Sequence, residues 1–249
     1  MLDVNVAFAV KALGTGFWCL CYFVMVLQGL TTGDAVFSPW PHKSMAYCIV
    51  WEALFSWAKP KTSSGEVVKA SKAQAEMTRI LFLAWMILDI PLMLLFLWGG
   101  NGIPGEVVSE SRLHFLIELV VSFAIHYVCL RWGGVETFWF VKYLSIPYDI
   151  YISYTIYEVM ALRGPTASIF DVAVAVCKLL ADFFYLLPMI ALWQDIMPKH
   201  RNLATYAKGA FVIVFAIGTY ASNVTLLHWV LLRSPYFKPF VTISQFALV

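Results

Sequence analysis

Long apolar stretches joined only by short polar connections are the feature that most limits how this chain can fold. Seven stretches can be placed, at Phe8–Leu30, Ser44–Lys59, Ile80–Gly99, Leu113–Leu130, Phe138–Leu162, Phe170–Trp193 and Tyr206–Leu232. A helix of about 20 apolar residues crosses a bilayer, and no connection exceeds about 20 residues, which leaves no room for a separate soluble domain. We therefore predict an all-α fold, an integral membrane bundle of seven transmembrane helices that residues 1–249 form as a single domain.

The composition agrees with a multi-pass membrane protein. Hydrophobic residues make up 61% of the 249 residues and charged residues only 13%, whereas a soluble domain is about one-quarter charged. The net charge of +2 is too small to indicate nucleic acid as a partner. Membrane lipids are expected partners, and no obligate protein partner is evident. Eleven Lys and Arg residues flank the stretches on the side of the N-terminus and five on the other, which predicts a cytoplasmic N-terminus.

Glu52 lies within the second apolar stretch and has no obvious basic partner among its neighbours. An ionisable residue inside a membrane is costly and usually functional. An apolar environment favours the protonated form of a carboxyl, so this residue could donate a proton to an apolar substrate. Glu52 is therefore our candidate catalytic acid.

Other polar residues inside the stretches have two readings. Glu118, Ser122 and His126 recur every four residues and so share one helix face, which could line a pocket and move a proton or could form interhelical hydrogen bonds. Lys178 and Asp182 are also four apart, and the spacing predicts a structural ion pair.

Polar residues closer to the ends of the stretches fit a simpler interpretation. Asp149, Glu158 and Asp171 are expected to be solvated acids at the membrane interface. Asp89, by contrast, lies well inside the third stretch and is a further candidate for the site.

Aromatic residues form 16% of the chain, and most fit an interfacial belt or ordinary packing. Trp18, Trp51 and Trp85 are instead in the middle of their stretches. Indole faces attract cations, so these three residues are candidates for the walls of a substrate cavity.

Several catalytic motifs are missing. The sequence contains no aspartate-rich DxxxD pair, no HExxH, no GxSxG and no Cys/His spacing typical of zinc ligands. The five cysteines all lie in apolar stretches and are interpreted as packing residues. Neither a metal nor another cofactor is therefore expected.

Five ordered patches resemble the fungal integral-membrane terpene cyclases of meroterpenoid and indole-diterpene pathways, the paxilline and pyripyropene type. They are Gly14-x3-Trp18-x3-Tyr22 with Gly29, Asp34 and Pro41; Cys48-Ile49-Val50-Trp51-Glu52; Trp85-Met86-Ile87-Leu88-Asp89; Ser153; and Ala161-Leu162-Arg163-Gly164 with Ser168. Together they extend over most of the chain.

The resemblance implies an isomerase of fungal secondary metabolism in the endoplasmic reticulum membrane. Such enzymes open the terminal epoxide of a lipophilic meroterpenoid without a metal, and a carboxylic acid that corresponds to Glu52 donates the proton. The family has a second acid in its last helix, where this chain has Asn223. An amide cannot supply a proton or a negative charge, so Asn223 is expected to orient the reacting groups, and Asp89 or Glu118 to replace the acid. Trp51, Trp18, Trp85, Glu118 and His126 are the expected substrate contacts.

Two alternatives remain open at this point. The chain could hydrolyse a polyketide epoxide or close a cyclic ether on it, which needs one acid and a weaker partner. It could also be a small transporter or a lipid-binding membrane protein without catalytic activity, although no inverted repeat of the transporter kind is evident.

Overall fold

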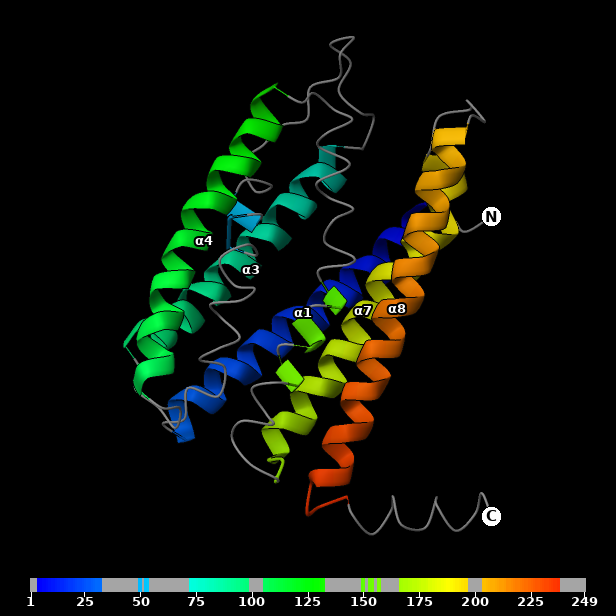
Figure 1. Cartoon of the computed structure of the whole chain (residues 1–249). Coiled ribbons are helices and arrows are strands. Elements are labelled where there is room, and N and C mark those ends of the chain that lie inside the picture. The colour runs from blue at the N-terminus through cyan, green and yellow to red at the C-terminus, as the bar shows by residue number, and fades with distance from the viewer. Residues whose placement is uncertain are drawn as a thin grey trace.

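The computed structural model describes residues 4–32, 49–50, 52–53, 72–98, 105–132, 149–150, 152–154, 156–157, 166–196 and 203–237. Five long helices account for most of these residues: α1 (Val4–Thr32), α3 (Lys72–Trp98), α4 (Gly105–Trp132), α7 (Ile169–Ile196) and α8 (Leu203–Arg233) (Figure 1). Short helical pieces lie at 49–50, 52–53, 149–150, 152–154 and 156–157. The described part of the chain contains no strand, so the all-α prediction is confirmed there.

The helices extend beyond the apolar stretches that predicted them. They are 27 to 31 residues long, which is about 40 to 46 Å at 1.5 Å per residue and exceeds the roughly 30 Å of a hydrocarbon core. The helix α3 begins at Lys72, eight residues before the predicted stretch, because polar residues with good helix propensity continue its first turns. The predicted stretches Ser44–Lys59 and Phe138–Leu162 lie largely outside the described residues.

Two described helices are long and apolar enough to cross a membrane, over Ala9–Thr31 and Ile213–Arg233, and Phe115–Val128 is a shorter apolar segment. The helix α7 carries Asp171, Lys178 and Asp182 within a few turns, which lowers its apolar character. The number of membrane-spanning helices therefore stays a prediction.

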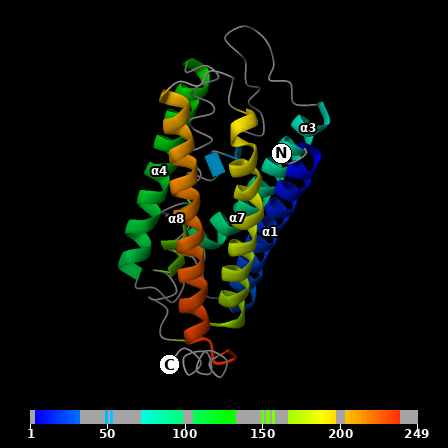
Figure 2. The same ribbon diagram turned by 90° about the vertical axis from the view of Figure 1, so that its right-hand side faces the viewer.

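The helix directions alternate. Figures 1 and 2 show α1, α3 and α8 running one way and α4 and α7 running the other way, so that α1 begins at the end of the molecule opposite to the end where α8 finishes. In an up-and-down bundle of seven segments, the first, third and seventh run one way and the fourth and sixth run the other way. The helices α1, α3 and α8 and the helices α4 and α7 follow this pattern.

The core forms where α1, α7 and α8 pack side by side and α3 packs against α1. The face of α1 toward α7 holds buried residues three or four positions apart: Gly14, Trp18, Cys21, Met25 and Gln28. A matching series follows α8: Ala216, Thr219, Asn223, Leu226 and Val230. This spacing is that of helices packed at a small angle.

Gly14 allows the closest approach of α1 and α7. A Cβ at this position would lie 2.5 Å from the backbone nitrogen of Tyr185 and 2.8 Å from the carbonyl oxygen of Ala181. Small residues at such crossings let helix backbones approach each other. The next glycine, Gly16, has nothing within 4 Å of its Cβ position.

A capping box begins α7. The Ser168 Oγ accepts a hydrogen bond from the Asp171 backbone N–H at 3.2 Å, and the Asp171 carboxylate accepts one from the Ser168 backbone N–H at 2.8 Å. The Gln28 amide of α1 donates to the same Asp171 carboxylate at 3.1 Å. The expectation of a solvated interfacial acid is therefore wrong for Asp171, which is buried because helix capping and Gln28 satisfy its oxygens.

Candidate active site

The Glu52 and Asp89 side chains interact with each other in the interior of the bundle. Glu52 belongs to the short piece 52–53, Asp89 belongs to α3, and their exposed fractions are 2% and 0%. Both carboxyl oxygens of Asp89 are buried without a hydrogen-bond partner among the described residues, and Glu52 is the carboxyl group that interacts with them electrostatically.

This arrangement determines what the pair can do. Ionised carboxylates only accept hydrogen bonds, so two carboxyl groups can bond to each other only if one of them keeps a proton. Two adjacent negative charges away from water would also repel each other strongly. Burial and mutual repulsion therefore favour the state in which the Glu52–Asp89 pair keeps at least one proton.

Trp85 lies one helical turn before Asp89 on the same face of α3. Its indole Nε1 donates to the carbonyl oxygen of Thr15 on α1 at 3.4 Å, and its ring meets the ring of Phe82 edge-on with centroids 5.2 Å apart. The Cys19 thiol interacts with both Trp85 and Asp89. The pair is thus bordered by an aromatic ring and by α1.

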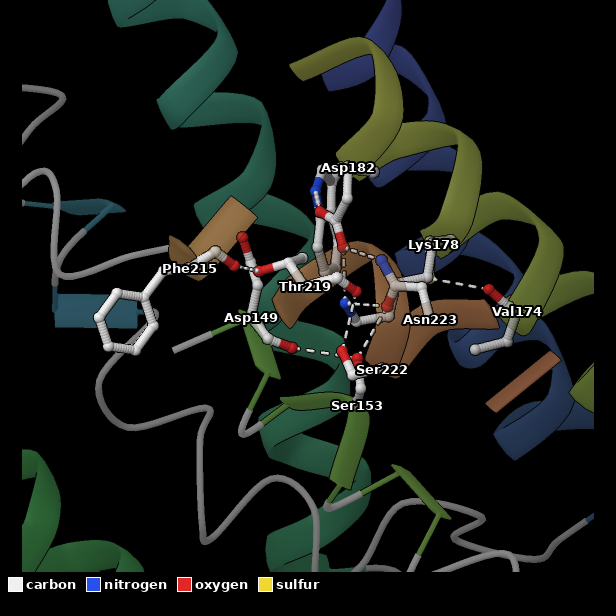
Figure 3. Close-up of polar contacts among 11 residues, drawn as sticks. Asp149, Ser153, Val174, Lys178, Asp182, Phe215, Thr219, Ser222 and Asn223 are labelled. Atoms are coloured by element: carbon white, nitrogen blue, oxygen red, sulfur yellow. Dashed lines mark hydrogen bonds and ion pairs between the residues drawn. The ribbon is translucent and has the colours of Figure 1, made fainter. Parts of the chain in front are cut away.

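A second polar cluster lies on a different face of α1, the face that packs against α7 and carries Trp18. We call it the ion-pair network, and its members are Trp18, Ser153, Lys178, Asp182 and Asn223. The Lys178 ammonium donates to the Asp182 carboxylate at 2.7 Å and to the Asn223 amide oxygen at 2.9 Å (Figure 3). The predicted Lys178–Asp182 ion pair is confirmed.

The other contacts of the network bring four parts of the chain together. The indole Nε1 of Trp18 donates to Asp182 at 2.9 Å, and Lys178 Nζ lies 5.1 Å from the centre of the same ring. The Asn223 Nδ2 donates to Asp182 at 2.6 Å, and the Ser153 hydroxyl donates to the Asn223 oxygen at 2.8 Å. Each charge in the network therefore has an opposite charge or a dipole beside it.

These contacts change how Asn223 and Trp18 are interpreted. The two ends of the Asn223 amide bond to α7 and to Ser153, so the structure places Asn223 in the ion-pair network. Trp18 uses its N–H and one ring face within the same network. As contacts of a substrate, both stay predictions.

Asp149 stands at the edge of the network. Its carbonyl oxygen accepts a hydrogen bond from the Ser153 hydroxyl at 3.1 Å, and its carboxyl interacts electrostatically with Asp182 and Lys178. It is only partly buried, whereas Lys178, Asp182 and Asn223 have no exposed surface. A solvated acid at the membrane interface was expected at Asp149, whereas the structure describes it as partly buried and within electrostatic reach of Asp182 and Lys178.

The remaining candidates lie elsewhere or outside the described residues. His126 is buried on α4, and its Nδ1 is 2.7 Å from the carbonyl oxygen of Ser122. Glu118 is partly buried two turns earlier on the same helix, as the four-residue spacing predicted. The views place α4 at one side of the bundle (Figures 1 and 2). Trp51 and Glu158 fall outside the described residues.

The sequence reasoning missed the link between α8 and the residues around 153. Asp149 and Ser153 are four apart and share a helix face, which is a signal in the sequence. That this face meets Asn223, 70 residues later, depends on the packing of helices distant in sequence.

No family model matches this sequence, and neither a curated protein nor a solved structure shows significant similarity to it.

Proposed function

We propose that this protein is a membrane-bound enzyme that opens an epoxide by acid catalysis on a lipophilic substrate, in the manner of the terpene cyclases that its sequence resembles. The observation that carries the proposal is the buried Glu52–Asp89 pair, because two interacting carboxyls away from water favour keeping a proton. An acid in such a place can protonate an epoxide oxygen as its carbon–oxygen bond breaks.

The roles within the pair follow from this chemistry. Glu52 donates its proton to the epoxide oxygen, and the partner carboxyl of Asp89 keeps Glu52 protonated before the reaction. Asp89 thereby takes the place of the acid that the resembled family has in its last helix, a position filled here by Asn223. The Trp85 ring, next to the pair, offers an indole face to a carbocation.

A membrane location is supported by the surface of the helices. Two helices have the length and hydropathy of a membrane span. On α4, large apolar residues are exposed nearly all round the helix, among them Leu113, Leu116, Ile117, Val120, Val121, Phe123, Ile125 and Val128. Soluble monomers rarely expose so large an apolar surface, whereas lipid would cover it. The multi-pass topology and the endoplasmic reticulum are part of the same proposal.

The test is turnover in microsomes from cells that produce the protein. An epoxidised prenyl-aromatic probe and a polyene-pyrone epoxide would be supplied separately, and loss of epoxide measured. We expect Glu52→Gln to lower epoxide consumption by about 10²- to 10⁴-fold, since that is the usual contribution of a general acid. Asp171→Asn is a matched control, because it also removes a buried carboxyl but one that caps a helix.

The products separate the alternatives. Carbocyclic products from the prenyl-aromatic probe support a cyclase, and a diol or cyclic ether from the polyene-pyrone probe supports the hydrolase alternative. Full activity of Glu52→Gln would remove the acid assignment. Proton flux in liposomes, with neither epoxide consumed in microsomes, would favour a transporter.

A further inference from the structure

The exposed surface of α8 changes in character along the helix. In the first part of the span its exposed side chains are all apolar: Ile213, Val214, Ile217, Ala221 and Val224. In the last turns the exposed residues are instead Thr225, His228 and Arg233. A helix that leaves the hydrocarbon region of a bilayer changes in this way, because charged side chains are costly inside lipid. This order indicates a membrane boundary close to the end of α8.

Aromatic rings gather at the same end of α8. The ring of Trp229 meets the ring of Tyr157 edge-on, with centroids 4.8 Å apart. Tyr154, three residues before Tyr157, and Tyr236, just after α8, are 59% and 63% exposed. Trp and Tyr are enriched where a membrane meets water, because their rings are apolar and their N–H or O–H groups are polar. The aromatic residues therefore support the same boundary.

Arg233 provides a positive charge at this boundary. Its side chain is exposed, and the central carbon of its guanidinium lies 4.0 Å from the centre of the Trp229 ring. A ring face offers no strong hydrogen-bond acceptor, so this contact does not use up the five N–H donors of the guanidinium. The planar guanidinium matches the oxygens of a phosphate group, which it can bind through two N–H donors at once.

The backbone around Arg233 is held by the segment that leads into α7. The Ala167 backbone N–H donates to the Arg233 carbonyl oxygen at 3.2 Å, and the Ser234 N–H donates to the Val230 carbonyl oxygen at 2.9 Å. Figures 1 and 2 show the end of α8 and the beginning of α7 at the same end of the molecule. With Tyr157 against the indole of Trp229, three segments of the chain thus fix the position from which the guanidinium extends.

The length of the span agrees with Arg233 at a boundary. The segment Ile213–Arg233 has 21 residues, which is about 30 Å at 1.5 Å per residue and equals the thickness of a hydrocarbon core. Asn223 is ten residues before Arg233 on this helix, about 15 Å from the boundary. The ion-pair network would then lie near the middle of the bilayer.

We propose that Arg233 and Trp229 form a binding site for the phosphate group of a membrane phospholipid. The guanidinium binds the phosphate, and the acyl chains lie along the exposed apolar side chains of α8 that precede it. The bound lipid holds the end of α8 at the membrane boundary. This inference rests on the proposed membrane location and not on the proposed epoxide chemistry.

The experiment compares two lipids that share their acyl chains and differ in the phosphate group, dioleoyl phosphatidic acid and dioleoylglycerol. The full chain is purified in an uncharged detergent, and the apparent Kd of the tightest-bound lipid is measured by native mass spectrometry. We expect phosphatidic acid to bind more tightly than dioleoylglycerol. Arg233→Gln should weaken phosphatidic acid binding by about 10- to 100-fold, the usual contribution of a hydrogen bond to a charged group. It should leave dioleoylglycerol binding unchanged, which separates loss of the phosphate contact from misfolding.

Two further variants serve as controls. Arg233→Lys keeps the charge but not the planar guanidinium, so its Kd should fall between those of Arg233→Gln and the natural sequence. Arg79→Gln is the matched control, because Arg79 is also exposed but lies near the beginning of α3, at the opposite end of the bundle from the end of α8. Its Kd for phosphatidic acid should equal that of the natural sequence.

Three results would overturn the inference. The first is an unchanged phosphatidic acid Kd in Arg233→Gln, and the second is equal binding of the two lipids by the natural sequence. The third is binding of inorganic phosphate alone as tightly as phosphatidic acid, which would assign the site to a free anion. Release of the protein from membranes by alkaline carbonate would refute the membrane location and this inference together. Full activity of Glu52→Gln would remove the proposed acid and leave the assignment of Arg233 intact.

Discussion

The ion-pair network predicts a large loss of stability when one charge is removed. In Lys178→Met, the Asp182 carboxylate loses its 2.7 Å ammonium partner but keeps the Trp18 and Asn223 donors at 2.9 and 2.6 Å. Breaking a buried pair costs about 3–5 kcal/mol, and the two retained hydrogen bonds place this variant near the lower end. At roughly 2–4 °C per kcal/mol for a chain of this size, about 3 kcal/mol corresponds to a fall in Tm of roughly 6–12 °C.

The assay is thermal unfolding in detergent, followed by circular dichroism. The double variant Lys178→Met/Asp182→Asn removes both charges, so it should unfold at a higher temperature than Lys178→Met, because no uncompensated charge remains buried. Asp182→Asn alone leaves the ammonium without its carboxylate and should resemble Lys178→Met. A Lys178→Met protein as stable as the natural sequence, or a double variant less stable than the single one, would refute the reasoning.

Two further stability predictions come from the helix contacts and use the same assay. Gly14→Ala should destabilise the protein by about 1–3 kcal/mol through overpacking, because its Cβ would meet the α7 backbone at 2.5 Å. Gly16→Ala has open space around its Cβ and should be neutral or stabilising. Equal effects at the two glycines would contradict the close crossing of α1 and α7. Ser168→Ala removes the capping box of α7 and should lower stability by about 0.5–2 kcal/mol. Thr31→Ala loses hydroxyl hydrogen bonds only to the carbonyl oxygens of Leu27 and Gln28 in its own helix and should have a smaller effect. A larger loss in Thr31→Ala would argue against the cap.

The sequence predicts helices well because their signal is local. Five of the seven apolar stretches coincide with long helices, and the Lys178–Asp182 pair follows from a four-residue spacing within one helix. The ends of the helices were predicted less well, since polar residues such as those before Ile80 can continue a helix beyond its apolar part.

Contacts between distant segments could not be read from local spacing. The sequence offered Asp89 among several partners for Glu52, and only packing brings their side chains together. For Asn223 the resemblance predicted a role in orienting the reacting groups, but it did not show that its amide bonds to Lys178, Asp182 and Ser153. Asp171 was expected in solvent, yet Gln28 of the first helix bonds to its carboxylate, a contact between segments 143 residues apart that local spacing does not show.

The position of Trp18 and Cys19 on α1 limits how this protein can change in evolution. These two adjacent residues point about 100° apart and serve the ion-pair network and the surroundings of Asp89, respectively. Inserting or deleting one residue before them would turn both away from their partners at once. We expect homologues to vary the first helix by substitution while its length between Gly14 and Gln28 stays constant, so this interval should align without gaps.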